Sequence, residues 1–345
     1  MESRKGGILV IDVQEVITDS RILANRYILR NGFPFTAITY PANVYDAIVV
    51  KYPQDVPCFS PRINGSSHSL KEQIEFINRH RIEKALIIAE NIDFITMCPT
   101  LKYLRIVPAD SAGEGFDYSP LYKMSQIKSL QCSTVYGFRE EFSTCIDCIQ
   151  INGLEEIHVT DSGYKNFNAV ETLKGLGLSN YEKRDMSEAF SSSILDTLSI
   201  FQSKIITLEG IQKSQKMQCL YLYYNRSLQD ISALKKVKRT LRALRIENCP
   251  KINDFSVLGE LENLELLELS GSNELPSLSF LKKMKNLKTF LFNMNVKDGD
   301  LTPCLDLSYV YSEKNRKHYN LKDCELPKGN YTRGNENIEK WRRLE

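Results

Sequence analysis

The hydrophobic positions of this chain repeat with a fixed period from residue 82 onward. An apolar residue is followed by two free positions, a second apolar residue, one free position and a third apolar residue. The clearest copies are Leu101, Leu104 and Ile106; Leu154, Ile157 and Val159; Leu195, Leu198 and Ile200; Met217, Leu220 and Leu222; Leu241, Leu244 and Ile246; Leu264, Leu267 and Leu269; and Leu287, Phe290 and Phe292. Weaker copies start at Ile82, Ile127 and Leu173, and the starts are 19, 26, 27, 19, 22, 22, 24, 23 and 23 residues apart. Such a period predicts a solenoid of stacked repeats.

Each repeat divides into a strand, a turn and a second apolar segment. The last part of the phrase alternates with period two, which predicts a short strand with one buried face. Three residues beyond the phrase we expect an inward side chain that bonds the turning backbone. The residues at that position are Asn225, Cys249, Ser272 and Asn295. Apolar residues then return at every third position, as in Leu228, Ile231, Leu234 and Val237, which indicates a short helix or 3₁₀ segment on the convex side.

These repeats resemble those of bacterial leucine-rich-repeat proteins of the internalin-like type, which are about 22 to 24 residues long. The resemblance covers about 82–312 and is most specific from 195 to 295. It implies an α/β solenoid, a leucine-rich-repeat horseshoe or arc with a parallel sheet on its concave face. It also implies a protein that acts by binding a partner.

Both ends of a solenoid expose an apolar repeat face and need caps. We expect residues 1–81 to form an α+β N-terminal cap, 82–312 to hold about ten repeats, and 313–345 to form a short C-terminal cap and polar tail. Strands are expected at Ile8–Val13, Thr36–Tyr40, Ala47–Lys51 and near Ser308–Ser312. Ser69-x-x-Glu72 resembles a capping box that opens a helix with Leu70, Ile74 and Ile77 on one face.

Charge and cysteine content narrow the class of protein. The 345 residues include 45 Lys and Arg against 43 Asp and Glu, a net charge of +2. This balance argues against a dedicated nucleic-acid-binding or membrane-surface protein. Nine cysteines without a disulfide-like spacing, and an N-terminus without a signal peptide or membrane segment, predict a reduced, cytoplasmic protein.

The sequence contains no recognisable catalytic motif. Cys145-x-x-Cys148 is a single CxxC without a second pair or a nearby histidine, so buried thiols are favoured over a metal or redox site. No Walker-type loop, His-Glu-x-x-His or Gly-x-Ser-x-Gly is present. The basic runs at 235–239 and 282–285 fall on convex segments and indicate a solvated face. We therefore expect no enzyme activity, no cofactor and no metal.

The free positions of the strands are the candidate binding residues, because they project from the concave face without a packing role. These candidates are Tyr103, Arg105, His158, Phe201, Tyr221, Tyr223, Tyr224, Arg245, Glu247 and Glu268. His158 is expected at an exposed position. Tyrosine and arginine are enriched at binding hot spots. We therefore expect Phe201, the three central tyrosines and Arg245 to form the core of an interface.

The favoured function is a non-catalytic scaffold that binds another protein, and not nucleic acid or a membrane, through its concave face. A bacterial immunity protein that neutralises a toxin is the sharper hypothesis, and it rests on analogy between folds. The first alternative is a surface adhesin of the internalin kind, which would need an upstream signal and a wall anchor. The second is an enzyme or nucleic-acid binder that uses residues 1–81.

Overall fold

In the computed structural model, the description covers residues 47–52, 69–79, 81–109, 112, 115–132, 145–160 and 163–330. The strands expected at Ile8–Val13 and Thr36–Tyr40, and the polar tail beyond residue 330, lie outside these ranges. The chain divides into two compact units near residue 173, and each is described by itself. No helix of the described residues is long and apolar enough to cross a membrane.

The first unit contains a parallel sheet in the order β1-β2-β3-β4-β6. Its strands are β1 Ala47–Tyr52, β2 Lys84–Ala89, β3 Tyr103–Pro108, β4 Ser129–Cys132 and β6 Glu156–Thr160. A small parallel pair is formed by β5 Ile146–Asp147 and β7 Tyr164–Lys165. The strand expected at Ala47–Lys51 is therefore present as β1. It pairs in parallel with β2, so the parallel sheet begins ahead of residue 82.

The helix expected after Ser69 is α3, Leu70–Arg79. The Glu72 N–H donates to Ser69 Oγ at 3.3 Å, and the Ser69 N–H donates to Glu72 Oε2 at 2.8 Å. This reciprocal pair is the predicted capping box. The buried face differs from the prediction, because the structure buries Gln73, Phe76 and Ile77. Of the expected face, only Ile77 is fully buried. The buried face of α3 is therefore rotated by about one residue from the predicted face.

The second unit contains parallel strands in the order β8-β9-β10-β11-β12-β14-β16. They are β8 Gly175–Ser179, β9 Thr197–Phe201, β10 Cys219–Tyr223, β11 Ala243–Glu247, β12 Leu266–Ser270, β14 Thr289–Phe292 and β16 Tyr309–Ser312. A second small parallel pair is formed by β13 Glu274–Leu275 and β15 Asn295–Val296. Each of the ten predicted phrases coincides with a strand, from β2 to β14, and the strand expected near Ser308 is β16.

The apolar phrase positions stack in register from strand to strand. Leu220 lies between Leu198 and Leu244, and Leu222 lies between Ile200 and Ile246. All six side chains are fully buried. Burial of one Leu or Ile side chain contributes roughly 1.5–3 kcal/mol, and here each of the three repeats contributes one side chain to each of two columns. The chain is therefore a leucine-rich-repeat solenoid.

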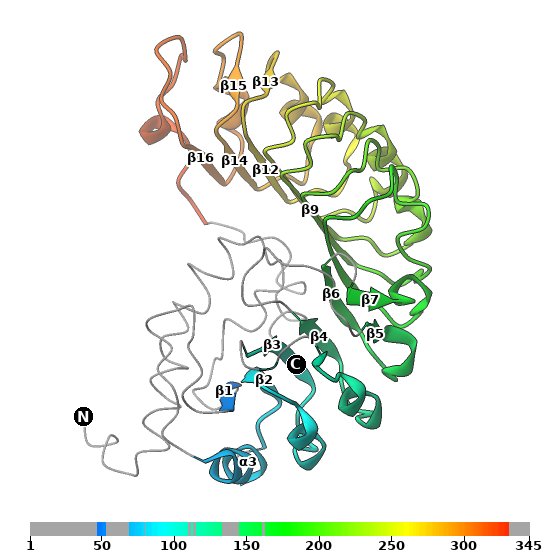
Figure 1. Cartoon of the computed structure of the whole chain (residues 1–345). Coiled ribbons are helices and arrows are strands. Elements are labelled where there is room, and N and C mark those ends of the chain that lie inside the picture. Colours follow the sequence, from blue (N-terminus) through cyan, green and yellow to red (C-terminus); the bar gives the residue numbers. More distant parts are fainter. Residues whose placement is uncertain are drawn as a thin grey trace, which may run out of the picture. The chain divides into compact units, whose positions relative to one another are not determined.

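Short 3₁₀ segments form the side away from the strands in most repeats, although the repeat that begins with β8 has turns there (Figure 1). They are η4 Asp93–Met97, η6 Ser119–Lys123, η7 Cys148–Gln150 and η9 Phe167–Ala169 in the first unit, and η10 Ile211–Lys213, η11 Ser232–Val237, η12 Ser256–Glu260, η13 Ser279–Lys283, η14 Thr302–Cys304 and η15 Asp323–Glu325 in the second. The three-residue apolar spacing at 228–237 predicted η11 correctly. A 3₁₀ turn has about three residues, so every third side chain faces the core.

Aspartates open several of these 3₁₀ segments, which the sequence reading missed. The N–H of a Ser two residues later donates to the aspartate at 2.7 Å for Asp230 and at 2.8 Å for Asp117 and Asp254. Asp185 accepts the same bond from the Ser187 N–H at 2.8 Å, ahead of a turn that is not a 3₁₀ segment. Thr302 makes the same bond to Asp300 at 2.9 Å. Asp-x-Ser/Thr is thus a second signature of the repeat. The aspartate accepts a hydrogen bond from a backbone N–H at the start of the segment, and this N–H has no partner within the turn.

Inward polar side chains close the turn after each strand. Asn225 is fully buried, accepts from the Ser203 N–H at 3.0 Å and donates to the Ile200 carbonyl at 2.9 Å. Cys249 is also buried, as predicted. The prediction was wrong for Ser272 and Asn295. Asn273 occupies the inward position instead, and its amide donates to the carbonyls of Cys249 and Ile252.

The failure at Ser272 has a local cause. Gly271 has a φ of 139°, and its turn places one more residue between strand and inward position than the two preceding repeats have. Asn295 instead lies in β15, where its amide donates to Glu274 Oε1 at 2.9 Å. A fixed count along the sequence cannot register such a one-residue insertion.

The residue directly after each strand from β8 to β11 has a left-handed backbone. These residues are Asn180, Gln202, Tyr224 and Asn248, with φ values between 48° and 56°. Each N–H still donates to a carbonyl of the next repeat, at 2.8–3.0 Å. The chain can therefore turn away from the strand without losing the repeat-to-repeat ladder. Asparagine tolerates this conformation, whereas a bulky aromatic residue such as Tyr224 rarely adopts it.

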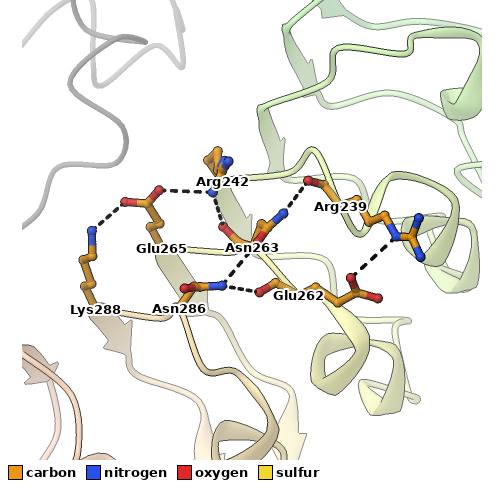
Figure 2. Close-up of polar contacts among 7 residues, drawn as sticks. All are labelled: Arg239, Arg242, Glu262, Asn263, Glu265, Asn286 and Lys288. Carbon is orange, nitrogen blue, oxygen red and sulfur yellow. Dashed lines mark hydrogen bonds and ion pairs between the residues drawn. The ribbon is translucent and has the colours of Figure 1, made fainter.

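Charges at the edge before the strands link neighbouring repeats (Figure 2). The Glu265 carboxylate lies between Arg242 Nη1 at 3.5 Å and Lys288 Nζ at 3.0 Å. Glu262 accepts from Lys238 at 2.6 Å and lies 3.6 Å from Arg239 Nε. An acidic repeat thus lies between two basic repeats. Three residues of the basic run at 235–239, Lys236, Lys238 and Arg239, thus have an acidic partner in a neighbouring repeat.

The amides of Asn263 and Asn286 reinforce the same edge. Asn263 donates to the Arg239 carbonyl at 2.7 Å, and Asn286 donates to the Glu262 carbonyl at 2.8 Å (Figure 2). Asn286 also donates to Asn263 Oδ1 at 3.2 Å. These bonds join the turns of three consecutive repeats and fix their stacking.

The segment after β16 covers the last strand of the second unit. The Val310 N–H donates to the Pro327 carbonyl, and the Gly329 N–H donates to the Ser308 carbonyl, both at 2.9 Å. Lys328 Nζ lies 5.7 Å and 5.6 Å from the ring centroids of Tyr309 and Tyr311 and 2.7 Å from Asp323 Oδ1. This segment pairs with the edge of the sheet, where an unpaired strand would otherwise invite association.

Replacing Asn225 with alanine tests the inward hydrogen bonds. The change leaves a buried N–H and a buried carbonyl without partners, so we expect the free energy of unfolding to fall by about 2–4 kcal/mol. Asn253→Ala, at an exposed turn position of the following repeat, is the control and should change it by less than about 0.5 kcal/mol. Urea denaturation measures both. Equal stability of the two variants would show that Asn225 does not support the turn.

The aspartate caps predict a loss of stability in acid. The Ser N–H groups lower the pKa of Asp117, Asp230 and Asp254 in the folded chain. A carboxyl whose folded pKa is depressed stabilises the fold above its unfolded pKa of about 3.9 and loses this contribution as pH falls through its folded value. Stability should therefore decline below about pH 4. The double variant Asp230→Asn/Asp254→Asn keeps an acceptor oxygen but cannot titrate, so its decline should be shallower than that of wild type.

Thermal unfolding between pH 2.5 and 6 measures this slope. Asp306→Asn, at an exposed position that opens no 3₁₀ segment, is the control and should keep the wild-type slope. An unchanged slope in the double variant would contradict the role of these caps.

Candidate functional site

The candidate residues lie at the outward positions of the strands, in both units. Tyr103, Arg105 and His158 belong to the first unit, on β3 and β6. The other candidates belong to the second unit, on β9 to β12 and the turn after β10. The second group lies on consecutive paired strands, so the fold brings its members together. We call Phe201, Tyr223, Tyr224 and Glu247 the rim site, and Tyr221, Arg245 and Glu268 the central row.

The rim site lies where β9, β10 and β11 end. Phe201, Tyr223 and Glu247 are register neighbours on the three strands, and all three side chains are half-buried. Tyr224 follows directly and is 37% exposed. Its ring packs edge-on against Phe201, with ring centroids 5.8 Å apart. Burial and the nearby Glu247 carboxylate raise the pKa of Tyr224.

The central row runs across β10, β11 and β12 as an aromatic ring, a cation and an anion. The Arg245 guanidinium lies 5.4 Å from the centre of the Tyr221 ring, and Arg245 Nε is 3.3 Å from Glu268 Oε2. Burial raises the pKa of Glu268, and Arg245 opposes that shift. The guanidinium is thus held by a ring and a carboxylate of neighbouring repeats.

Tyr221 was expected to be exposed, but its side chain is buried. It is only 5% exposed and belongs to a buried cluster with Cys219, Ala243 and Leu266, against which Tyr223 packs. Cys219 and Ala243 are small, so the neighbouring Tyr221 and Leu266 side chains have room to pack over them. Tyr221 therefore contributes to packing on this face, and the expectation that all three tyrosines are free of packing is wrong.

The first-unit candidates form a different set. Tyr103 and Arg105 are half-buried, and burial together with Glu83 raises the pKa of Tyr103 to about 12. His158 was expected to be exposed but is 1% exposed. Burial and then the Arg105 charge lower its pKa to about 3, so the imidazole is neutral at physiological pH. His158 lies in register with Gln131, which in turn lies in register with Arg105.

Sequence reasoning missed several outward residues that the structure places on the same sheet. Leu266 belongs to the buried cluster around Tyr221, and Tyr311 continues the column of the central row at 44% exposure. Lys328 reaches this column from the segment after β16. The strand register would have located Tyr311, whereas the position of Lys328 depends on how the chain folds back.

Among the described cysteines, Cys132, Cys145 and Cys148 lack the lowered pKa of a reactive thiol. Cys148 is fully buried, and burial raises the pKa of both Cys145 and Cys148. Burial also raises the pKa of Cys132 to about 12. Reactive thiols need a lowered pKa and access to solvent. Within the described ranges, no group of three or more His, Cys, Asp or Glu side chains could hold a metal ion.

Comparisons with known proteins say little about this chain. No protein-family model matches it, and no curated protein sequence does. Among solved structures, a chain from "Crystal structure of TLR13-ssRNA13 complex" is similar, with 13% identity and a TM-score of 0.42. The match covers 80% of this chain and 48% of that chain, so this chain spans about half of its length. The fold assignment rests on the strand register and the repeat period. Leucine-rich-repeat solenoids are typically non-catalytic binding scaffolds.

The burial of Tyr221 predicts a stability effect. Tyr221→Ala removes a ring from the cluster with Cys219 and Leu266 and should lower the free energy of unfolding by about 3 kcal/mol. Tyr311→Ala, on the same column but largely exposed, should lower it by less than about 1 kcal/mol. Guanidinium denaturation followed by circular dichroism compares the two. Equal losses would mean that Tyr221 is not part of the packed cluster.

Proposed function

We propose that this protein is a non-catalytic scaffold that binds another protein through the strand face of its second unit. The rim site is the core of the interface, and the central row lies beside it. The observation that carries the proposal is Tyr224, a solvent-exposed aromatic residue in a left-handed conformation. The equivalent positions hold Asn180, Gln202, Asn248 and Gly271. A costly conformation at an exposed aromatic side chain indicates a role other than stability.

The composition of the face supports a protein partner. Phe201, Tyr223 and Tyr224 present large rings with few rotatable bonds, and such residues dominate binding energy at protein interfaces. Arg245 is held in place by Tyr221 and Glu268, so little further ordering is needed on binding. A nucleic-acid partner would favour an excess of cations here, whereas Arg245 is accompanied by Glu247 and Glu268.

Within this function, we propose a cytoplasmic bacterial immunity protein of the internalin-like repeat type that neutralises a toxin. The support is analogy with other solenoids of this kind together with a single concentrated aromatic site. Co-expression with a toxin from the same host should restore growth, and the Tyr224 variant described below should not. Equal rescue by both forms would place the interface elsewhere.

Affinity capture from the native host, followed by mass spectrometry, is the direct test. Wild-type protein should recover one partner in near-stoichiometric amount. Failure to recover any partner from host cultures grown under several conditions would count against the scaffold function itself.

Tyr224→Asn separates binding from stability. Asparagine accepts the left-handed backbone, so the free energy of unfolding should stay equal or rise by up to about 1 kcal/mol. Loss of the ring should weaken partner binding by at least about tenfold, as expected for a hot-spot aromatic residue. Phe280→Ala, on η13 of the same unit, is the matched control and should leave binding unchanged. Wild-type affinity in Tyr224→Asn would remove this residue from the interface.

A further inference from the structure

We infer that the rim site recognises a cationic side chain, a lysine or arginine that the partner protein inserts between Phe201, Tyr223 and Tyr224 and against the Glu247 carboxylate. This inference rests on the proposed function and names the chemistry of the partner at its central contact.

The geometry places the aromatic rings and one carboxylate together. Glu247 lies beside Tyr223 on the adjacent strand, and Phe201 lies on the other side of Tyr223. The Tyr224 N–H donates to the Glu247 carbonyl at 2.8 Å, which ties the exposed ring to the strand that carries the carboxylate. The site therefore combines rings from two repeats with an anion from a third.

Glu247 is held in position by a neutral group. The Asn248 amide donates to Glu247 Oε1 at 3.4 Å, and the charge of this carboxylate contributes to the raised pKa of Tyr224. The amide is neutral, so its bond orients the carboxylate without forming an ion pair. Among the residues that the structure describes, no cation forms an ion pair with Glu247, although the carboxylates 262, 265, 268 and 274 of the next repeats all have one.

The adjacent cation is already engaged. Arg245 lies two residues before Glu247 on the same strand, but its guanidinium points to Tyr221 and Glu268. Arg245, Glu247 and Glu268 together carry one positive and two negative charges, so the net charge of these three residues is −1. An incoming cation therefore pairs with the Glu247 carboxylate without displacing Arg245.

Aromatic rings beside an anion are the preferred surroundings of an ammonium or guanidinium group. The face of an aromatic ring attracts a cation within about 6 Å of its centre. A half-buried carboxylate adds a charge-assisted hydrogen bond that is less screened than one in bulk water. The carboxylate repels an acidic side chain, and a purely apolar side chain would pack on the rings but leave the carboxylate charge without a partner. The rim site therefore selects for positive charge.

Binding of short peptides tests this selectivity without knowledge of the natural partner. The probes are fluorescently labelled hexa-lysine, hexa-arginine and hexa-glutamate peptides, measured by anisotropy with the full chain at low salt. The two basic peptides should bind and the acidic peptide should not. Glu247→Gln, which keeps the shape and removes the charge, should weaken their binding by about tenfold. Tyr224→Asn should weaken it to a similar degree.

Glu260→Gln is the matched control, because Glu260 is an exposed carboxylate on η12 of the same unit. It should leave peptide binding at the wild-type level. Equal losses in Glu247→Gln and Glu260→Gln would show that basic peptides respond only to net charge, and would overturn the inference. Wild-type binding in Glu247→Gln would overturn it as well. Thermal unfolding of each variant confirms that the fold is intact.

The natural partner distinguishes this inference from the proposed function. If Tyr224→Asn abolishes capture of the partner but Glu247→Gln does not, the scaffold function stands and cation recognition is wrong. If neither variant affects capture, the interface lies away from the rim site and both fail. If both abolish it, replacement of single lysines and arginines on the partner should identify one whose loss reproduces the effect.

Discussion

The backbone ladder between successive repeats is the interaction on which the rest of this structure depends. Parallel pairing in register places Leu198, Leu220 and Leu244 in one column and Ile200, Leu222 and Ile246 in another. A single repeat cannot bury its own apolar face, so its stability comes from its neighbours. The ladder also continues past the strands β8 to β11, because the left-handed residue after each of them still donates its N–H to the next repeat. The turn, the inward Asn225 and the 3₁₀ segments all follow from this spacing.

The same constraint creates the candidate site. Once the inward positions are fixed, the outward positions of each strand are free to vary, and the register aligns one residue from each repeat into a row. Tyr221, Arg245 and Glu268 are far apart in sequence but lie side by side on β10, β11 and β12. The spacing between parallel strands is about 4.8 Å, which suits contact between a ring, a guanidinium and a carboxylate. A single repeat could supply only one of these groups.

Electrostatics distinguish the two sides of the second unit. At the edge shown in Figure 2, Glu262 and Glu265 of one repeat are paired with cations of both neighbours. Individual exposed pairs contribute little to stability, but a network that alternates from repeat to repeat favours one stacking order. On the strand face, Glu268 is paired with Arg245, whereas among the described residues Glu247 has no ion-pair partner and accepts from the Asn248 amide. The proposed cation recognition rests on this difference.

The sequence by itself determined the repeat, its strands and its 3₁₀ segments, because the spacing of apolar residues is local and recurs in each repeat. It also placed Phe201, Tyr223, Arg245 and Glu247 on one face, since alternation along a strand separates inward from outward positions. Tyr224 follows its strand, and its position depends on the left-handed turn. Only the tertiary structure decided which outward residues are exposed. Tyr221 and His158 occupy outward positions and are nevertheless buried, and alternation cannot show what packs over an outward side chain. The one-residue shift from Ser272 to Asn273 follows from the local turn at Gly271, which a fixed spacing does not include. The ion pair between Arg245 and Glu268 was decided in three dimensions, because its partners are more than 20 residues apart.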